Sequence, residues 1–497
     1  MNILGISAGF HDAGVSVIND GQILFAAHAE RYSKKKHDEH VNESILQEAF
    51  SHGRPDIIAY YERPWLKKIR QLYAGQYDKA LDFSDITVGQ YLSKRCPNMD
   101  IRGIPTVHIS HHRSHAAAGF STSPFTKATV VVIDAIGEWD TVSIVAAEYD
   151  SQGKARYKDL WKQHYPHSIG LFYSAMTERV GLKPMDEEYI MMGMAAYGKT
   201  RFKSRIHNDL IDDLTEVRFK TNLHLGVDSD AYSSLSDMDI AASSQRIAEN
   251  LICSVMKRAQ EFDWSSNLVY MGGVALNCSA NRLLGNYFDN IWIMPNPGDC
   301  GSSLGAAAAV YGSRLDWQHP YLGTNIPGEY PVDLLIKCLT DSKIVGVASG
   351  PAEFGPRALG NRSLLADPRG RDIKDKVNEI KRRQKFRPFA PVILAEHAGQ
   401  YFDMPRAFRS SPYMQSVSHC RSPDLFPAIV HHDGSSRVQT VAKDAGSGIR
   451  QLLEAWYEKT GCPMLLNTSL NIRGEPMVND RSDADRFEQQ YKVKVIS

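Results

Sequence analysis

The chain opens with two short apolar runs that are separated by a glycine-rich turn. Residues 3–18 read Ile-Leu-Gly-Ile-Ser-Ala-Gly-Phe-His-Asp-Ala-Gly-Val-Ser-Val-Ile, which predicts a strand, a turn and a second strand. Residues 130–145 show the same pattern. Ser7 precedes its Val-Ser-Val run by eight positions, and Asp134 precedes its Val-Ser-Ile run by the same eight. The sequence therefore contains a weak internal repeat of a strand–turn–strand unit.

Such a repeat indicates a duplicated α/β domain around a central cleft. In the actin-like ATPase and sugar-kinase architecture, paired hairpins of this kind hold nucleotide phosphates and a metal between two lobes. The alternative is that the two hairpins are unrelated.

A second domain is indicated after a stretch of turn-forming residues. Residues 317–333 contain three prolines and two glycines without periodicity, which predicts a linker. A short buried strand at 343–348 then begins a new apolar pattern. We therefore expect a first domain over residues 1–320 and a second over residues 335–497.

The composition excludes several classes of protein. The chain has 497 residues, with 57 basic and 57 acidic side chains, so no global attraction to nucleic acid is expected. Its seven cysteines are dispersed and form no Cys-x-x-Cys pair, which favours reduced thiols and a cytoplasmic protein. Neither a signal peptide nor a run of about 20 apolar residues is found, so we expect no membrane association.

Two histidines follow a strand-like stretch at 106–110. If a helix starts near His111, then His111 and His115 lie on one helix face and can share a metal ion. Asp134 ends an apolar strand, and Asp299 lies in a tight turn before a helix of small residues. This set suits Fe2+ or Zn2+ acting as a Lewis acid; we expect Fe2+, with Zn2+ as the open alternative. The competing interpretation of the histidines is a solvated helix start.

The remaining candidate chemistry is for phosphate-bearing ligands. Residues 269–277 end an apolar strand in Gly272-Gly273, where bare backbone can approach a ribose or a phosphate closely. Residues 353–363 contain two arginines among turn formers, and the run at 381–387 holds five cations. Such arginines suit phosphate or carboxyl-like ligands, whereas the alternatives for the basic run are a solvated helix face or a nucleic-acid contact.

Together these stretches resemble the O-carbamoyltransferase family that acts on antibiotics and nodulation factors, which includes the tobramycin and cephamycin enzymes. The most specific match is Glu353-Phe-Gly-Pro-Arg-Ala-Leu-Gly-Asn-Arg-Ser363. The other matches, in family order, are His11-Asp12, Lys36-His37-Asp38, His111-His-x-x-His115-Ala, 272–277, Asp299-x-Gly-x-x-Leu-Gly-Ala, 386–391, 433–441 and 467–471. The chain departs from the family pattern at 188–195 and at Leu470 and is short for the family, so the resemblance does not identify the acceptor.

The resemblance implies a duplicated actin-like first domain, similar to the transferase that makes threonylcarbamoyl-adenosine in tRNA, and a YrdC-like α/β second domain. The second domain would join carbamoyl phosphate and ATP, with Mg2+, into carbamoyl-adenylate and pyrophosphate. The first would transfer the carbamoyl group to a hydroxyl of a small-molecule acceptor and release AMP. A homodimer is an open expectation.

The resemblance also assigns residues by position. The metal ligands would be His111, His115, Asp134 and Asp299; the adenylate contacts would be Gly272, Gly273 and Asn277. Asp12 and Lys36 would lie near the transferred carbamoyl group, and His11 or Asp12 is our candidate for the base that activates the acceptor. The contacts for carbamoyl phosphate and ATP would be Arg357, Arg362, Lys385, Arg387, Arg437, Ser469 and Asn471, although a register with Lys381 and Arg383 in place of Lys385 and Arg387 fits the motif too.

Two other functions compete with this interpretation. The same chemistry could act on a hydroxymethylated nucleobase in DNA, which would have to be flipped out of the duplex. Alternatively, the chain could be an actin-like ATPase without carbamoyl transfer, which would leave the arginines and serines of the second domain unexplained.

Overall fold

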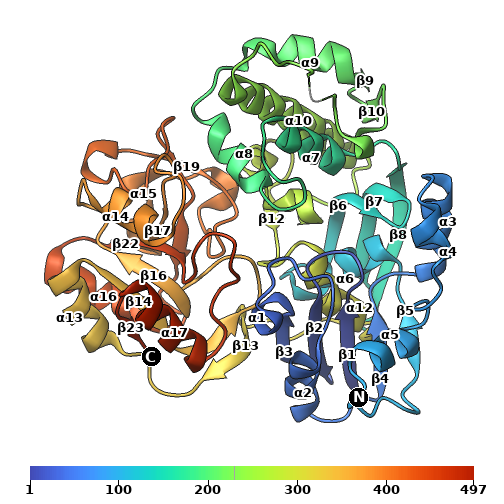
Figure 1. The fold of residues 1–497 in the computed structure, drawn as a ribbon, viewed down its shortest axis with the longest axis horizontal. Coiled ribbons are helices and arrows are strands. Elements are labelled where there is room, and N and C mark those ends of the chain that lie inside the picture. The colour runs from blue at the N-terminus through green and yellow to red at the C-terminus, as the bar shows by residue number, and fades with distance from the viewer. Residues whose placement is uncertain (229) are drawn as a thin grey trace. The chain divides into compact units, whose positions relative to one another are not determined.

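The internal repeat predicted from the sequence corresponds to two five-stranded sheets that share one strand order. The computed structural model describes residues 1–228 and 230–497, and both sheets lie in a first unit, residues 1–29 and 37–318 (Figure 1). One sheet has the order β3-β2-β1-β4-β5, formed by Gln22–His28, Gly14–Asn19, Asn2–Ser7, Ile57–Tyr60 and Thr106–His108. The other has the order β8-β7-β6-β11-β12, formed by Ala155–His164, Asp140–Tyr149, Lys127–Gly137, Asn267–Met271 and Asn290–Trp292.

The strand directions repeat as well. β1 runs antiparallel to β2 and parallel to β4, and β6 runs antiparallel to β7 and parallel to β11. Each antiparallel pair is joined by one of the glycine-containing turns seen in the sequence, with Ser7 paired to Gly14 and Gly137 paired to Asp140. The two hairpins are therefore related, and the first unit is a duplicated α/β structure.

Each sheet is followed by a helix that packs on the other sheet. Helix α6 (His111–Thr122) follows β5 and contacts β6 and β11, whereas α12 (Ser302–Tyr311) follows β12 and contacts β1 and β2. The two helices also pack on each other. Small residues permit this approach, because a Cβ on Gly305 would lie 1.8 Å from the carbonyl oxygen of Ser114. The ends of these crossed helices bring residues from both halves together.

Further helices belong to the first unit. They are α2 (Glu43–Ser51), α3 (Pro64–Tyr73), α4 (Tyr77–Leu81), α5 (Val88–Arg95), α7 (Ile169–Arg179), α8 (Glu188–Ala195), α9 (Lys203–Leu210), α10 (Asp237–Glu261) and α11 (Cys278–Asn281). A small ribbon pairs β9 (Ile211–Asp213) with β10 (Arg218–Phe219). The long helix α10 packs against α7 and α8.

The second unit, residues 30–36 and 319–497, is built on a six-stranded mixed sheet. Its order is β21-β17-β22-β16-β14-β23, formed by Gln439–Val441, Ala390–Leu394, Met464–Ser469, Arg362–Ala366, Ile344–Ala348 and Val495–Ile496. Its helices are α1 (Glu30–Ser33), α13 (Val332–Ser342), α14 (Ile373–Ile380), α15 (Ala395–Tyr401), α16 (Gly448–Thr460) and α17 (Arg481–Tyr491). A three-stranded ribbon joins β18 (Phe402–Asp403), β19 (Ser418–Cys420) and β20 (Ser435–Ser436).

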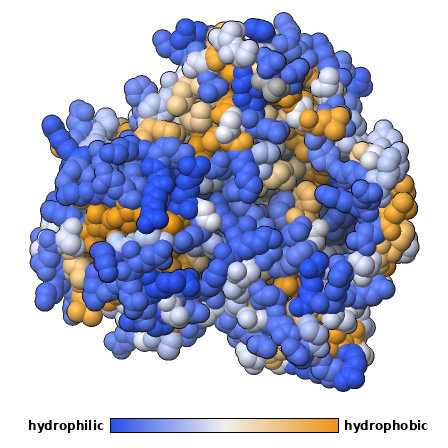
Figure 2. All heavy atoms as spheres, viewed as in Figure 1, coloured by the Kyte–Doolittle hydropathy of each residue, from blue (hydrophilic) through white to orange (hydrophobic). Residues whose placement is uncertain are grey.

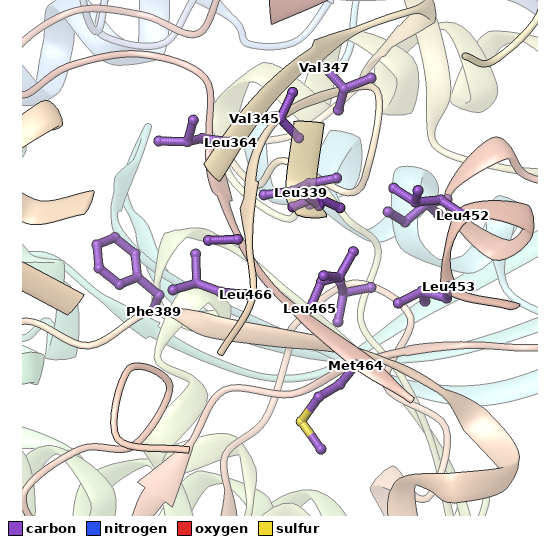
Figure 3. Close-up of a cluster of buried hydrophobic side chains, with 14 of the residues drawn as sticks. Leu339, Val345, Val347, Leu364, Phe389, Leu452, Leu453, Met464, Leu465 and Leu466 are labelled. Atoms are coloured by element: carbon purple, nitrogen blue, oxygen red, sulfur yellow. The ribbon is translucent and has the colours of Figure 1, made fainter. Parts of the chain in front are cut away.

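The core of the second unit lies between this sheet and helices α13 and α16. Figure 3 shows Leu339 of α13 and Leu452 and Leu453 of α16 gathered with side chains of β14 and β22. These leucines are fully buried, so the sheet face that they cover is shielded from water. The opposite end of β22, at Ser469, is only partly buried.

The domain boundaries differ from the sequence prediction in two respects. The predicted linker at 317–333 contains strand β13 (Tyr321–Ile326), which pairs with β15 (Gly350–Glu353) and belongs to the second unit. Residues 30–36 also belong to that unit, although they come from the first part of the chain. Neither is visible from composition, because both depend on contacts that are distant in sequence. In the described part of the chain, no helix combines the length and the apolar character that a membrane span requires.

Candidate metal centre and anion site

Four predicted metal ligands meet at the ends of the crossed helices. His111 and His115 lie one turn apart on α6, Asp134 lies in β6, and Asp299 immediately precedes α12. All four are buried, and their ligand atoms lie within 4.8 Å of one another. The helix start predicted near His111 is therefore present, and it turns both imidazoles toward the two carboxylates.

The spacing of these atoms fits a metal ion. His111 Nε2 lies 3.2 Å from Asp134 Oδ2, 3.4 Å from Asp299 Oδ1 and 3.1 Å from His115 Nε2. The same two carboxylate oxygens lie 3.2 and 3.3 Å from His115 Nε2. Four ligands bonded at about 2.1 Å to a central ion in a tetrahedron are separated by about 3.4 Å. Two imidazole nitrogens and two carboxylate oxygens are the donor types that Fe2+ and Zn2+ accept.

Outer hydrogen bonds orient the ligands. His115 Nδ1 donates to the carbonyl oxygen of Pro297 at 3.0 Å, which leaves the lone pair of Nε2 directed at the centre. Asp134 Oδ1 accepts the backbone N–H of Ala135 at 2.8 Å, so Oδ2 faces the histidines. The hydroxyl of Ser7 donates to the carbonyl oxygen of Asp299 at 2.7 Å. The ligand loop at 297–299, which follows the second sheet, is thus held by residues from the first half of this unit.

The histidines and carboxylates of the cluster shift one another's pKa values. Burial lowers the pKa of His111, but Asp299 and Asp134 outweigh it and raise that pKa well above its ordinary value; the pKa of His115 is raised in the same way. Burial raises the pKa of Asp299, yet His111 and the nearby His11 lower it to about 2. Each imidazole thus faces carboxylates that favour positive charge on it. A divalent cation bound by these four side chains would take the place of protons on the histidines, as at other metal sites.

A row of alternating carboxylates and imidazoles leads away from this cluster. His11 Nε2 lies 3.8 Å from Asp299 Oδ2, and His11 Nδ1 lies 2.9 Å from Asp12 Oδ2. The other oxygen of Asp12 lies 2.8 Å from His37 Nδ1, and His37 Nε2 lies 2.8 Å from Asp186 Oδ1. Burial lowers the pKa of His11, whereas Asp299 and Asp12 raise it, to about 9 overall. The structure therefore places His11 and Asp12 beside the candidate metal centre.

The predicted adenylate contacts lie next to Asp134. Gly272 has φ 92°, and a Cβ there would lie 2.2 Å from the carbonyl oxygen of Ile133, so no larger residue fits. The N–H of Gly273 donates to Asp134 Oδ1 at 3.4 Å. Asn277 is engaged internally: its side chain exchanges two hydrogen bonds with Gln245 and caps α11 through the N–H of Ala280. The glycines thus border the cluster, while Asn277 supports the loop.

In the second unit, one lysine brings the strand end of β22 and the basic run together. Lys381 Nζ donates to Ser469 Oγ at 3.0 Å and to Asn471 Oδ1 at 2.7 Å, and Ser469 Oγ donates to Asn471 Oδ1 at 2.6 Å. Lys385, in contrast, is exposed and pairs with Glu379. The geometry therefore favours the register with Lys381 and Arg383, the alternative that the sequence left open, over the one with Lys385.

Positive charge surrounds this lysine. Burial lowers the pKa of Lys381 well below its ordinary range, and the charges of Arg383, Arg387 and Lys36 lower it further. Lys36 therefore acts on Lys381 of the second unit, to which residues 30–36 belong. The family resemblance had predicted Lys36 near the transferred carbamoyl group in the first domain. A buried lysine among cations is a site that favours an anionic ligand.

The arginines of the Glu353–Ser363 loop differ in role. Arg362 is completely buried and donates to backbone carbonyl oxygens of Thr324, Ser349, Gly350, Asn361 and Asn479. These five carbonyl oxygens occupy its guanidinium, so the predicted ligand contact of Arg362 does not fit this structure. Arg357 lies half-buried in the same loop.

Glu353 and Arg437 complete this part of the second unit. One oxygen of Glu353 accepts the backbone N–H groups of Leu359, Asn361 and Arg362 at 2.8, 2.8 and 3.1 Å, which fixes the loop. Arg437 Nε is buried and has no hydrogen-bond partner within the described residues. A buried guanidinium donor without a partner is suited to a ligand oxygen.

Sequence reasoning missed some of these residues. His37 was visible in the motif Lys36-His37-Asp38, but its contact with Asp12 is between residues 25 apart. Asp186 carried no motif at all. Gln245 and Tyr173, which hold Asn277 in place, lie on α10 and α7 and had no signal beyond helical periodicity.

Comparison with protein families gives two matches that together span most of the chain. The model described as the N-terminus of the carbamoyltransferases matches residues 2–308, and the model described as their C-terminus matches residues 336–497.

Several curated proteins are similar over nearly the whole length. An uncharacterised protein of Synechocystis is 32% identical, with 98% of this chain and 94% of that protein covered. The 3'-hydroxymethylcephem-O-carbamoyltransferase of Amycolatopsis lactamdurans is 27% identical, with coverages of 95% and 94%. Nodulation protein NolNO of Sinorhizobium fredii is 28% identical, with coverages of 95% and 76%.

Solved structures show weaker likeness. The activator of the 2-hydroxyisocaproyl-CoA dehydratase of Clostridium difficile, with bound ADPNP, covers 63% of this chain and 94% of its own, at 14% identity and a TM-score of 0.35. Full-length HypF, in a phosphate- and nucleotide-bound form, covers 62% of this chain and 55% of its own, at 13% identity and a TM-score of 0.34. At these scores we base no argument on either.

Proposed function

Because the chain belongs to the carbamoyltransferase family and is thus an enzyme that transfers carbamoyl groups, we propose that it is an ATP-dependent O-carbamoyltransferase that works through carbamoyl-adenylate. The acceptor in this proposal is a hydroxyl of a small molecule. The observation that supports this proposal best is that the two units carry chemically different sites. One unit holds a metal-ligand cluster beside a histidine–aspartate pair, and the other holds a buried lysine among cations.

The proposal assigns the first unit to the actin-like class and the second to the YrdC-like class. The first assignment is supported by the duplicated sheets, whose hairpins carry Ser7 and Asp134 at equivalent positions. The second is supported by the mixed sheet and by the group formed by Lys381, Ser469 and Asn471. We also propose a cytoplasmic enzyme.

The second unit would make the adenylate. Carbamoyl phosphate loses its phosphate to water, and an oxygen of the resulting carbamate attacks the α-phosphorus of ATP, so that the bond to the β-phosphate breaks and pyrophosphate leaves. Negative charge develops on the phosphates in this step. Lys381 Nζ and Arg437 Nε offer buried N–H donors for it, with Arg387 and Arg357 as further contacts and Mg2+ as the usual companion of ATP.

The first unit would perform the transfer. The acceptor oxygen attacks the carbamoyl carbon, the bond from that carbon to the phosphate oxygen of AMP breaks, and the hydroxyl proton passes to the enzyme. His11 is suited to take it at Nε2, because its Nδ1 is hydrogen-bonded to Asp12, as in other histidine–carboxylate pairs. Asp299, Asp12 and Asp134 raise the pKa of His11, so the neutral form that this step requires is favoured when positive charge offsets these carboxylates.

The residues present fit a divalent metal. His111, His115, Asp134 and Asp299 would hold it, and when bound it would polarise a phosphate or carbonyl oxygen as a Lewis acid. Carbamoyl carbon is a weak electrophile, since its nitrogen donates into the carbonyl group, so polarisation and a good leaving group both lower the barrier. We propose Fe2+, with Zn2+ as the alternative.

The contacts do not favour the DNA alternative. It depended on the basic run at 381–387, but Lys381 is buried, Arg383 bonds Asn378 and the carbonyl oxygen of Pro388, and Lys385 pairs with Glu379. The exposed cations of the run are Arg382 and the paired Lys385, so it offers little of the open cationic surface that binds phosphate backbones.

Pyrophosphate release tests the proposal without knowledge of the acceptor. ATP and Mg2+ are incubated with the enzyme, with and without carbamoyl phosphate. We expect pyrophosphate only when carbamoyl phosphate is present. Release that is independent of carbamoyl phosphate, or no release from metal-loaded and folded enzyme, would refute the adenylate route.

A further inference from the structure

Helix α3 has its polar face inside and its apolar face outside. Arg70 and Gln71 are buried, and Lys67 Nζ donates to the carbonyl oxygen of Gly9 and to Glu62 Oε1, both at 2.9 Å. The opposite face carries large side chains that are exposed by about half or more: Trp65 60%, Ile69 53%, Leu72 45% and Tyr73 69%. A surface helix normally shows the reverse arrangement. The exposed spacing of four, three and one residues is that of a single helix face.

The apolar face continues onto α4 and beyond. Tyr77, Leu81 and Phe83 are exposed by 62%, 62% and 45%. The rings of Trp65 and Phe83 lie 5.7 Å apart, and Lys68 Nζ donates to the carbonyl oxygen of Lys79 at 2.5 Å, which ties the two helices together. Figure 2 shows apolar side chains gathered along the right-hand edge of the molecule, over α3 and α4. We call these seven side chains the α3–α4 face.

The area of this face is that of a protein interface. Seven side chains of roughly 200 Å² each, a little over half exposed, give an apolar surface on the order of 800 Å². A monomeric protein rarely exposes one patch of more than about 600 Å². A stable interface covers about 800 Å² on each partner. The inverted polarity of α3 thus makes sense if another surface covers it.

The surrounding charges favour a copy of the same chain. The exposed charged side chains among residues 63–83 are Arg63, Asp78, Lys79 and Asp82, which are two basic and two acidic groups. An anionic membrane surface or a nucleic acid would be met by basic residues instead. In a two-fold interface the same edge meets itself, so opposite charges on one edge can pair across the axis.

The orientation of α3 argues against the acceptor as the occupant. Its inner face contacts Gly9, next to the turn that carries His11, through Lys67. The apolar residues lie on the other side of the helix and so point away from that turn. We propose that the α3–α4 face is the interface through which two copies of this chain form a symmetric dimer.

Sedimentation velocity of the full chain over a range of concentrations tests this proposal, with Ile69→Glu and Leu72→Glu as disrupting variants. Leu225→Glu and Leu425→Glu are matched controls, because these leucines are 84% and 62% exposed elsewhere. We expect wild type and both controls to sediment as dimers and the two face variants as monomers, with unchanged circular dichroism and melting temperature. Hydrogen exchange of wild type provides a readout that needs no variant: residues 64–83 should lose protection on dilution.

Three results would overturn the proposal. The first is a wild-type monomer at about 100 µM, a concentration that populates dimers of micromolar affinity. The second is a dimer that persists in both face variants. The third is flotation of the wild type with phosphatidylcholine–phosphatidylglycerol vesicles when the face variants do not float, which would assign the face to a lipid surface.

Discussion

Asp12 and His37 are joined by a hydrogen bond of 2.8 Å between Oδ1 and Nδ1, and both adopt left-handed backbone conformations, with φ of 50° and 54°. Such conformations are uncommon for residues other than glycine and tend to occur where function requires them. Here they direct the side chains of Asp12 and His37 at each other. The pair lies next to His11 Nδ1, whereas His11 Nε2 faces the candidate metal centre. The pair therefore fixes the carboxylate that orients His11.

Replacement of Asp12 by asparagine should show the effect of its charge without a change in its backbone conformation. Asparagine tolerates the left-handed region, so Asp12→Asn should keep the turn but lose the charge that holds His11. We expect carbamoyl transfer to fall by roughly 10²- to 10⁴-fold, the usual contribution of acid–base groups. Carbamoyl-phosphate-dependent pyrophosphate release should persist in the same preparation. Equal loss of both half-reactions would show that Asp12 serves the fold rather than the transfer step.

Neighbouring histidines offer a matched test of the metal ligands. His115→Gln should lose the bound metal. Loss of an outer hydrogen-bond partner of a ligand lowers metal affinity by roughly 10- to 100-fold, and we expect loss of the ligand itself to lower it further. His112→Gln is the control, because His112 Nδ1 is bonded to Ser143 Oγ and lies outside the cluster. Elemental analysis after equilibration with Fe2+ or Zn2+ gives the occupancy. Retention of metal by His115→Gln, or its loss from both variants, would argue against the assigned ligand set.

The two lysines of the basic run should behave differently. Lys381→Ala removes a buried amine from the group with Ser469 and Asn471, and we expect pyrophosphate release to fall by about 10²- to 10³-fold. Lys385→Ala removes an exposed charge paired with Glu379 and should change the rate by less than about twofold. Circular dichroism checks that both variants fold. The reverse order of effects would restore the Lys385 register.

Gly272 is predicted to resist any side chain. Because φ is 92° and the carbonyl oxygen of Ile133 would lie 2.2 Å from a Cβ, Gly272→Ala should cost about 1–3 kcal/mol in the free energy of unfolding. Gly298→Ala is the control, since the space around it is open and its φ is −81°; we expect a change within about 0.5 kcal/mol. Urea unfolding measures both. Similar values for the two variants would contradict the close approach of β6 to this turn.

The ion pair between Glu396 and Arg450 should make stability depend on pH. Hydrogen bonding to Arg450 lowers the pKa of Glu396 from 4.5 to about 2. The contribution is thus fully present above pH 4.5 and is lost as the pH falls toward 2. Glu396→Gln should therefore be less stable than wild type at pH 7, and the difference should shrink between pH 4.5 and 3. A difference that grows on acidification would contradict this sign.

The sequence predicted those parts of the fold whose signals are local. The strand–turn–strand repeat, the helix beginning at His111 and the strand at 344–348 are all present, because apolar runs, turn glycines and histidine spacing report local structure. The cluster of His111, His115, Asp134 and Asp299 was predicted from the histidine spacing, from the positions of the two aspartates and from the family resemblance, and the packing of α6 on α12 explains why it forms.

The features that sequence could not supply depend on contacts between distant segments. Residues 30–36 join the second unit through Arg31, which donates to the carbonyl oxygen of Gly355, and through an ion pair of Lys34 with Asp483. Arg362 was predicted to bind a ligand because the sequence of its motif does not show that five backbone carbonyl oxygens accept its hydrogen bonds. The partner of Asp12 was hidden for the same reason.

The central claim is that ATP is cleaved between its α- and β-phosphates to make a carbamoyl-adenylate, and phosphorus NMR tests it most directly. ATP, Mg2+, carbamoyl phosphate and the metal-loaded enzyme are followed in one tube, so that every phosphorus-containing product is seen. The account predicts that ATP and carbamoyl phosphate disappear together, with AMP or its carbamoyl ester, pyrophosphate and phosphate as products. Formation of ADP and phosphate at a rate that does not depend on carbamoyl phosphate would contradict this claim. It would favour an ATPase with the same fold.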